Sequence, residues 1–88
     1  MRLAFSERAW NQYIYWQAED EKVLARVNAL LKECIGDPFR GIGKPEALSG
    51  NLSGWWSRRI NQEHRLIYRV TGTGDAQTLE VAQCRYHY

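Results

Sequence analysis

The sequence predicts an α+β domain in which two N-terminal helices pack on an antiparallel β-sheet. Apolar side chains recur at helical spacing through the first 35 residues. A glycine-rich stretch that contains both prolines follows, and three segments rich in β-branched and aromatic residues make up the rest. Because 88 residues leave no room for a second core, we expect a single domain over residues 1–88.

The first residues predict a short strand followed by a helix. The segment RLAF, residues 2–5, is apolar and suits an opening strand. Ser6 is a favoured N-cap residue, and Glu7 then lies in the first turn, where the helix dipole favours an acidic side chain. Trp10, Tyr13 and Ile14 share one face of this helix, so we expect them to pack in the core or against the second helix.

A second helix is predicted between Asp20 and Gly36. Asp20 can cap its N-terminus, and Gly36 followed by Pro38 is a strong stop signal. The apolar side chains between them form one stripe: Val23, Leu24, Val27, Leu30, Leu31 and Cys34. The two helices therefore form a helical hairpin.

The glycine-rich stretch, residues 36–54, predicts a long loop. Its GIGK sequence resembles part of a phosphate-binding loop, but it lacks the GxxxxGK[ST] spacing, and Pro45 follows Lys44 directly. We therefore exclude a nucleotide-binding P-loop. Loops of this length in compact domains are often functional, so the stretch is a candidate part of a site.

Three strands are predicted after the loop: residues 55–60 (WWSRRI), 64–70 (HRLIYRV) and 78–88 (TLEVAQCRYHY). The turns NQE and TGTGDAQ separate them, which predicts an antiparallel meander. Alternation along the middle strand places Arg65 and Arg69 on one face, opposite His64 and Leu66. Pairing of the last strand in the sheet would hold its final residues in place.

Basic side chains are concentrated in one part of the chain. The formal charge is only +2, but residues 54–70 hold Arg58, Arg59, Arg65 and Arg69 against Glu63 alone. The planar guanidinium group suits phosphate, so this stretch is a candidate polyanion site. A solvated strand face is the alternative.

Composition also argues against several classes of protein. No apolar stretch approaches the about 18–20 residues that span a bilayer. Charged residues at positions 7 and 8 interrupt the start before a signal-peptide core could form, so we expect a cytoplasmic location. Cys34 and Cys84 are expected to be buried thiols. His64 and His87 share no metal-ligand spacing with each other or with the cysteines, so we expect no metal and no other cofactor.

Glu46, Arg65 and His87 are candidate catalytic side chains if folding brings them together, and a structural or surface role for the strand histidine is the alternative. Attack of a ribose 2′-hydroxyl on the adjacent phosphate needs a base for its proton, a cation for the developing charge and an acid for the departing 5′-oxygen. A glutamate, an arginine and a histidine fill these roles without a metal, because histidine is partly protonated near neutral pH. Whether Arg65 and His87 share a face depends on strand register, which the sequence leaves open.

Three segments taken together resemble the YoeB/Txe toxins of the RelE superfamily: NLSGWWSRRINQEHRLIYRV, CRYHY and PF.G.GKPE.L. The resemblance covers essentially the whole chain, including YWQ in the first helix. It implies a RelE-like microbial RNase fold and a toxin of a bacterial type II toxin–antitoxin system. The implied activity is an endoribonuclease that cuts mRNA in the ribosomal A site and so inhibits translation.

The resemblance also implies partners. These are a YefM-type antitoxin whose C-terminal segment covers the active site, the bacterial ribosome with its A-site mRNA, and operator DNA, which is reached only through the toxin–antitoxin complex. Whether the chain forms a homodimer is left open.

Residue roles follow from the same resemblance. Glu46 matches the general base, Arg65 the arginine that stabilises the pentacoordinate phosphate, and His87 the general acid. Tyr88 matches a terminal tyrosine that helps to place the substrate.

Lys44, Arg58 and Arg59 are expected to contact RNA. Arg59 matches a basic residue that lines the same pocket, and because adjacent strand residues point in opposite directions, only one of Arg58 and Arg59 is expected there. Ser49 departs from the family, whose members carry a lysine at this position. The departure removes a phosphate contact unless Lys44 or Arg58 replaces it.

The aromatic and histidine side chains nearby have structural interpretations. One of Trp55 and Trp56 is expected in the core, as is Tyr86, and His64 is expected to be structural. Two other functions stay open. A ParE-type toxin that binds gyrase would lack the catalytic set that Glu46 and His87 supply, and a non-catalytic RNA-binding domain would need only the arginines and tryptophans.

Overall fold

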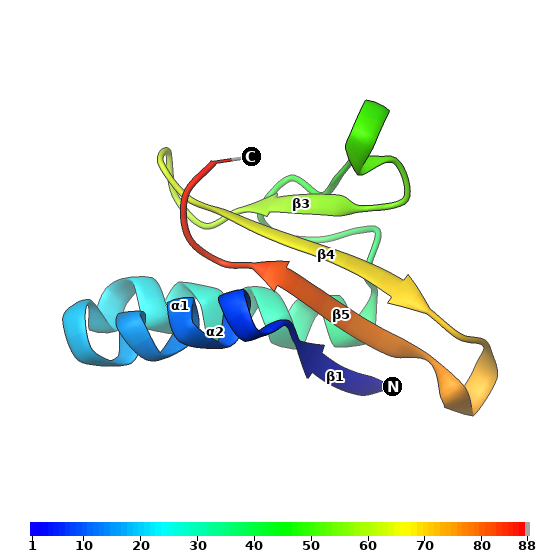
Figure 1. The fold of residues 1–88 in the computed structure, drawn as a ribbon, viewed down its shortest axis with the longest axis horizontal. Helices are drawn as coiled ribbons and strands as arrows, with labels where there is room; N and C mark the ends of the chain where they lie inside the picture. The colour runs from blue at the N-terminus through cyan, green and yellow to red at the C-terminus, as the bar shows by residue number, and fades with distance from the viewer. Residues whose placement is uncertain (88) are drawn as a thin grey trace.

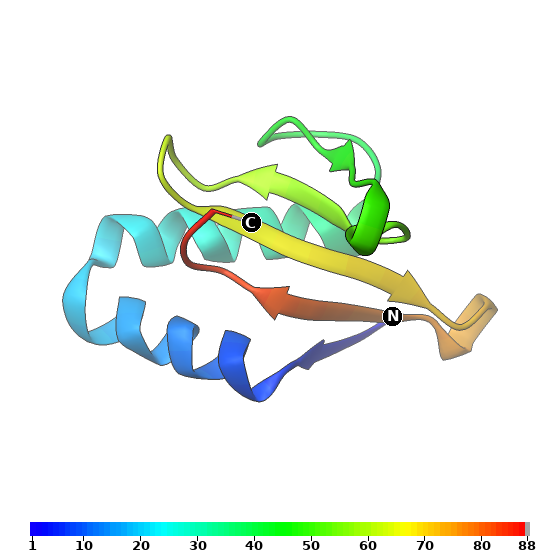
Figure 2. The ribbon, with the colours of Figure 1, turned by 45° about the horizontal axis from the view of Figure 1, so that its top comes forward.

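The computed structural model describes residues 1–87 as a five-stranded sheet with two helices on one face (Figures 1 and 2). The strands are β1 (Arg2–Phe5), β2 (Glu46–Ala47), β3 (Trp56–Arg59), β4 (Arg65–Thr71) and β5 (Thr78–Gln83). The helices are α1 (Glu7–Glu19) and α2 (Glu21–Gly36). The strand order is β1-β5-β4-β3-β2, and the face opposite the helices is open. The predicted α+β class is confirmed.

Both helices begin at the predicted caps, and α2 ends at Gly36 as predicted. Ser6 Oγ accepts a hydrogen bond from the Ala9 N–H at 3.0 Å and so caps α1. Asp20 Oδ1 accepts from the N–H groups of Lys22 and Val23, both at 3.1 Å, and caps α2. These bonds satisfy backbone donors that have no partner within a helix. Of the helices within residues 1–87, none has the length and apolar character that a membrane span requires.

The sheet is mixed rather than wholly antiparallel, which corrects one prediction. β1 pairs parallel with β5, with Arg2 opposite Thr78 and Phe5 opposite Val81. A parallel pair needs a long connection between its strands, and here the two helices and the rest of the sheet provide it.

β2 was not predicted either. Glu46 and Ala47 leave the glycine-rich loop and pair antiparallel with Ser57 and Trp56 of β3. Two residues are too few to produce a strand pattern, so this element exists only through its pairing.

The core lies between the helices and the middle of the sheet. Leu66 and Tyr68 of β4 and Leu79 of β5 are fully buried on the face that the helices cover. They pack against the apolar stripe of α2, whose buried members are Val27, Leu30, Leu31 and Cys34. Burial of apolar surface at about 25 cal/mol per Å² makes this interface the main source of stability.

The last strand was predicted to run to residue 88, but it ends at Gln83. Ile67 lies opposite Gln83 while Tyr68 lies opposite Val81, so Ala82 is an extra residue that bulges out of the ladder. The segment after β5 then turns away from the helices and crosses towards β4 on the open face (Figures 1 and 2). Tyr86 is 54% exposed there, so its predicted burial is wrong.

Gly43 is a position where the loop tolerates no side chain. Its φ is +84°, and a Cβ would lie 2.7 Å from Leu30 Cδ2 and 3.1 Å from Arg58 Cβ. We expect Gly43→Ala to lower the free energy of unfolding by about 1–3 kcal/mol, because the added methyl overpacks the core in a left-handed conformation. Gly36→Ala is the matched control: nothing lies within 4 Å of its Cβ, so urea denaturation should give an unchanged or higher stability. Equal values for both variants would contradict this account.

Candidate active site

The candidate active site lies on the open face of the sheet, at the end where β3 leads into β4. Residues directly opposite one another in paired strands point to the same face. Arg59 lies opposite Arg65, and Glu46 lies opposite Ser57, two residues from Arg59 along β3. The register therefore places Glu46, Arg59 and Arg65 on one face.

The segment after β5 brings His87 to the same end of the sheet. The Arg65 N–H donates to the Tyr86 carbonyl at 3.0 Å, so Tyr86 lies beside Arg65, and His87 is the next residue. His87 is exposed. Tyr88, the predicted substrate-placing residue, lies outside the described residues.

The Arg65 side chain is directed towards the loop between β3 and β4. Its Nη1 donates to the carbonyls of Asn61 at 2.7 Å, His64 at 3.0 Å and Gln62 at 3.3 Å. These three contacts fix the guanidinium at the rim of the open face. The nearby Glu63 side chain is 82% exposed and points to His64.

Lys44 is held close to Arg59 by the backbone. The Arg59 N–H donates to the Gly43 carbonyl at 2.6 Å, which ties the loop to the end of β3. Lys44 follows in a left-handed conformation, with φ of 51°, and is exposed. Lys44 and Arg59 thus place two solvent-accessible cations near Glu46, and their contact with RNA stays a prediction.

Arg58 lies in the interior and not at this surface. It is fully buried, and its guanidinium donates to three loop carbonyls: Asp37 at 2.7 Å, Arg40 at 2.8 Å and Ile42 at 3.0 Å. Its Nε donates to the Tyr68 hydroxyl at 3.1 Å. Burial contradicts the predicted RNA contact of Arg58. Its position gives it a structural role, in which it fastens the glycine-rich loop to the core.

The two adjacent tryptophans point in opposite directions, as predicted. Trp56 packs against the core and contacts Phe39, with ring centroids 4.8 Å apart. Trp55 lies under the Arg69 guanidinium, 4.4 Å from the ring centroid. Arg69 also forms an ion pair with Glu80 at 2.9 Å, so it belongs to a separate cluster at the other end of the open face. Hydrogen bonds from Thr71 and Arg69 hold the pKa of Glu80 below its ordinary value.

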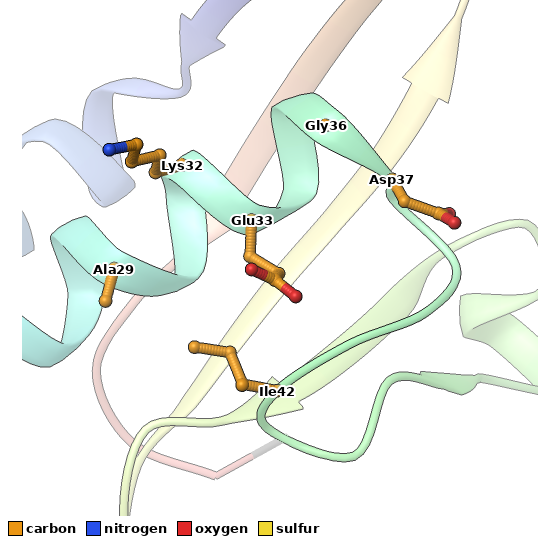
Figure 3. A pocket seen from close by; sticks show the side chains of 6 residues that line it. All are labelled: Ala29, Lys32, Glu33, Gly36, Asp37 and Ile42. Atoms are coloured by element: carbon orange, nitrogen blue, oxygen red, sulfur yellow. The ribbon is translucent and has the colours of Figure 1, made fainter.

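Two hollows in the surface lie away from these residues. One, of about 530 Å³, lies between α2 and the loop and is lined by residues that include Lys32, Glu33 and Ile42 (Figure 3). The other, of about 260 Å³, is lined by residues of β1 and β5 and by Trp55. Neither lining includes Glu46, Arg65 or His87. Glu46 and His87 are themselves exposed, so the candidate site is open to solvent.

The buried thiols have no place in the chemistry. Cys34 and Cys84 are both buried and unpaired with each other, as predicted. Burial raises the pKa of Cys84 to about 12 and also raises that of Cys34, so both remain protonated and unreactive at neutral pH. Among residues 1–87 there is also no cluster of three or more His, Cys, Asp or Glu side chains that could hold a metal ion.

Comparison with known proteins agrees with this arrangement. Residues 5–88 match the family model of the YoeB-like toxin of bacterial type II toxin–antitoxin systems. The chain belongs to the YoeB toxin family. It is 50% identical to Toxin YoeB of Escherichia coli K12, and the alignment covers 100% of both chains.

Solved structures of the YoeB family share the fold. The YoeB/ParE toxin from Agrobacterium tumefaciens has a TM-score of 0.96 at 46% identity, with 100% of both chains covered. A YoeB dimer and a heterotetrameric YoeB–YefM complex from Staphylococcus aureus have TM-scores of 0.85 and 0.86, each at 44% identity over 100% of this chain and 98% of the other. The RelBE2 toxin–antitoxin complex from Mycobacterium tuberculosis, at 20% identity and a TM-score of 0.70 over 98% of this chain and 96% of the other, shares the fold alone.

Proposed function

We propose that this YoeB-family toxin is a metal-independent endoribonuclease that cleaves mRNA in the A site of the bacterial ribosome and so stops translation. The observation that carries the proposal is the bond between the Arg65 N–H and the Tyr86 carbonyl, because it sets His87 beside Arg65. The register adds Glu46 and Arg59 on the same face. A base, cations and an acid then lie around one exposed surface.

In the proposed reaction Glu46 removes the proton from the ribose 2′-hydroxyl, and the oxygen attacks the adjacent phosphorus. His87 donates a proton to the departing 5′-oxygen, so the products are a 2′,3′-cyclic phosphate and a 5′-hydroxyl. Arg65 neutralises the charge that develops on the non-bridging oxygens. In the free protein its Nη1 is bonded to neutral carbonyls. Bonds from a guanidinium to a charged phosphate are stronger, so substrate would draw the group onto the phosphate.

Lys44 and Arg59 bind the flanking phosphates in this proposal, and Tyr88 helps to place the substrate. Arg59 is exposed and directly opposite Arg65, which suits contact with a neighbouring phosphate. Ser49 is also exposed, at the start of the short helical turn Gly50–Leu52, and its hydroxyl brings no charge to this part of the surface. The ribosome would supply further order, because an exposed surface by itself gives a flexible RNA little constraint.

The proposed binding partners are inferred from solved structures of related toxins. The structure from Staphylococcus aureus pairs YoeB with YefM, and we propose a YefM-like antitoxin whose C-terminal segment covers Glu46, Arg65 and His87. Operator DNA would be bound through that complex. A homodimer is proposed for the free toxin by similarity to the YoeB dimer from the same organism.

Mapping of mRNA 5′ ends after induction of the toxin tests the proposal. We expect new 5′-hydroxyl ends at a fixed position within codons of translated messages, and cleavage of a programmed A-site codon by the purified protein only when ribosomes are present. The same messages with a mutated start codon are the control and should remain intact. Growth arrest with intact mRNA and inhibited gyrase would indicate a ParE-type toxin, and RNA binding without new ends would indicate a non-catalytic domain.

A further inference from the structure

Tyr86 turns the backbone in a way that a tyrosine rarely adopts. Its φ is +69°, in the left-handed region that side chains with a Cβ disfavour. Such a conformation persists only where the surroundings fix it. Both backbone groups of Tyr86 are fixed here: its N–H donates to His64 Nδ1 at 2.7 Å, and its carbonyl accepts from the Arg65 N–H at 3.0 Å.

His64 is itself held firmly. The residue is 8% exposed, and its ring lies edge-on to Trp16, with centroids 4.9 Å apart. An Nδ1 that accepts a hydrogen bond carries no proton, so the ring proton lies on Nε2, which faces a Glu63 carboxylate oxygen 3.7 Å away. The imidazole is therefore neutral and oriented, with its acceptor directed at the Tyr86 backbone.

The preceding residues of the segment are anchored to α1. Trp16 Nε1 donates to the Cys84 carbonyl at 2.8 Å, and the Cys84 N–H donates to Gln12 Oε1 at the same distance. The Arg85 guanidinium lies 3.6 Å from the Tyr15 ring centroid. These contacts fix the segment up to Arg85, but the direction it takes next is determined at Tyr86.

We propose that His64 is a positioning residue for the catalytic acid: its Nδ1 holds Tyr86 in the left-handed turn that delivers His87 to the side of Arg65. This inference rests on the proposed function of His87. His64 does not touch the reacting atoms in this account. It acts by stabilising one backbone conformation of Tyr86, the left-handed one, over the others available to this residue.

Two substitutions test separately the hydrogen-bond acceptor and the aromatic ring of His64. His64→Phe keeps an aromatic ring against Trp16 and removes the acceptor. His64→Asn removes the ring but places an amide oxygen near the position of Nδ1. Gln62→Ala, an exposed neighbour on the same loop, is the control that should behave as the wild type. If His64→Phe fails to fold, His64→Gln replaces it, because its acceptor lies nearer the position of Nε2.

The first measurement is hydrogen–deuterium exchange of the Tyr86 amide by NMR in the free toxin. In the wild type and in His64→Asn we expect a protected amide, and in His64→Phe an exchange rate at least tenfold higher with unchanged protection of β4 and β5. Equal protection of Tyr86 in the wild type and His64→Phe would overturn the inference. This readout needs no cleavage, so it stands apart from the test of the proposed function.

The second measurement is single-turnover cleavage on programmed ribosomes. We expect His64→Phe to lower the rate at saturating toxin by about 10²-fold, the typical cost of a misplaced catalytic group, with the half-saturating concentration little changed. His64→Asn should recover most of the rate. Loss of rate in both variants while Asn keeps Tyr86 protected would show that His64 does not act through this bond. A wild type that cuts no mRNA would refute the proposed function and leave the exchange result to decide the role of His64 in ordering the segment.

Discussion

His87→Gln is expected to lower the rate of mRNA cleavage by about 10²–10⁴-fold, the usual cost of losing a general acid. Glutamine can still form hydrogen bonds but cannot protonate the departing 5′-oxygen. The His87 side chain is exposed, so the free energy of unfolding should change by no more than about 0.5 kcal/mol. Single-turnover cleavage on programmed ribosomes measures the rate, and the variant should still bind the proposed YefM-like antitoxin.

A modified substrate distinguishes an acid from a residue that only binds. Replacing the bridging 5′-oxygen of the scissile phosphate by sulfur creates a leaving group that departs without a proton. His87→Gln should cut this substrate at nearly the wild-type rate. Arg65→Ala is the matched comparison, because it removes charge stabilisation and should stay slow on both substrates. A His87→Gln variant that is equally slow on both would remove His87 from the acid role.

Arg58→Met is expected to destabilise the fold by about 3–5 kcal/mol, a large part of the about 5–15 kcal/mol that holds a small domain together. Methionine fills part of the volume but donates nothing. Three loop carbonyls and the Tyr68 hydroxyl would lose the donor that Arg58 provides, at a cost of about 1–3 kcal/mol for each buried group left without a partner. Urea denaturation measures the loss.

The neighbouring arginine supplies the control for this prediction. Arg59→Met changes an exposed side chain on the opposite face and should alter stability by no more than about 0.5 kcal/mol. Its effect should instead appear as weaker binding to RNA or ribosomes. If the two variants unfold at the same urea concentration, the structural role assigned to Arg58 is wrong.

The elements whose signals are local were predicted from the sequence. Ser6 and Asp20 cap the two helices because a side-chain oxygen one residue before a helix meets donors only two or three positions away. Gly36 ends α2 for the same kind of local reason. The apolar stripe of α2 and the alternation along β4 also follow from nearest neighbours, so these two parts of the core were correctly placed. The predicted core face of α1 was wrong in part: Tyr13 packs against the core, but Trp10 and Ile14 are exposed, and the buried residues of this helix are Ala9 and Trp16.

The elements that depend on partners distant in the sequence were not predicted. β2 exists because Glu46 and Ala47 meet β3, and β5 ends early because Ala82 bulges and Tyr86 turns. Nothing near these residues in the sequence specifies either event. The parallel pairing of β1 likewise depends on β5, which lies at the opposite end of the chain.

The site residues divide in the same way. Glu46, Arg65 and His87 were nominated by their chemistry and by resemblance to a family, whereas the register that joins Glu46 to Arg65 came only from the structure. Arg58 and Arg59 could not be told apart from the sequence, because the identity of a basic strand residue does not indicate whether buried carbonyls surround it. His64 was expected to be structural, but its contact with Tyr86 spans 22 positions and has no local signature.

The position of β1 beside β5 has a consequence for when the candidate site can assemble. Ser6 bonds to the Ala82 carbonyl, 76 positions along the chain, so closing the sheet means closing almost the whole polypeptide into a loop. Such closure costs chain entropy before contacts offset it, and folds with distant pairings form slowly. Tyr86 and His87 follow β5, so they can lie beside Arg65 only once β5 has paired with β4. Under the proposed function, a nascent chain therefore lacks the assembled site, and the ribosome that synthesises it is spared until folding is complete.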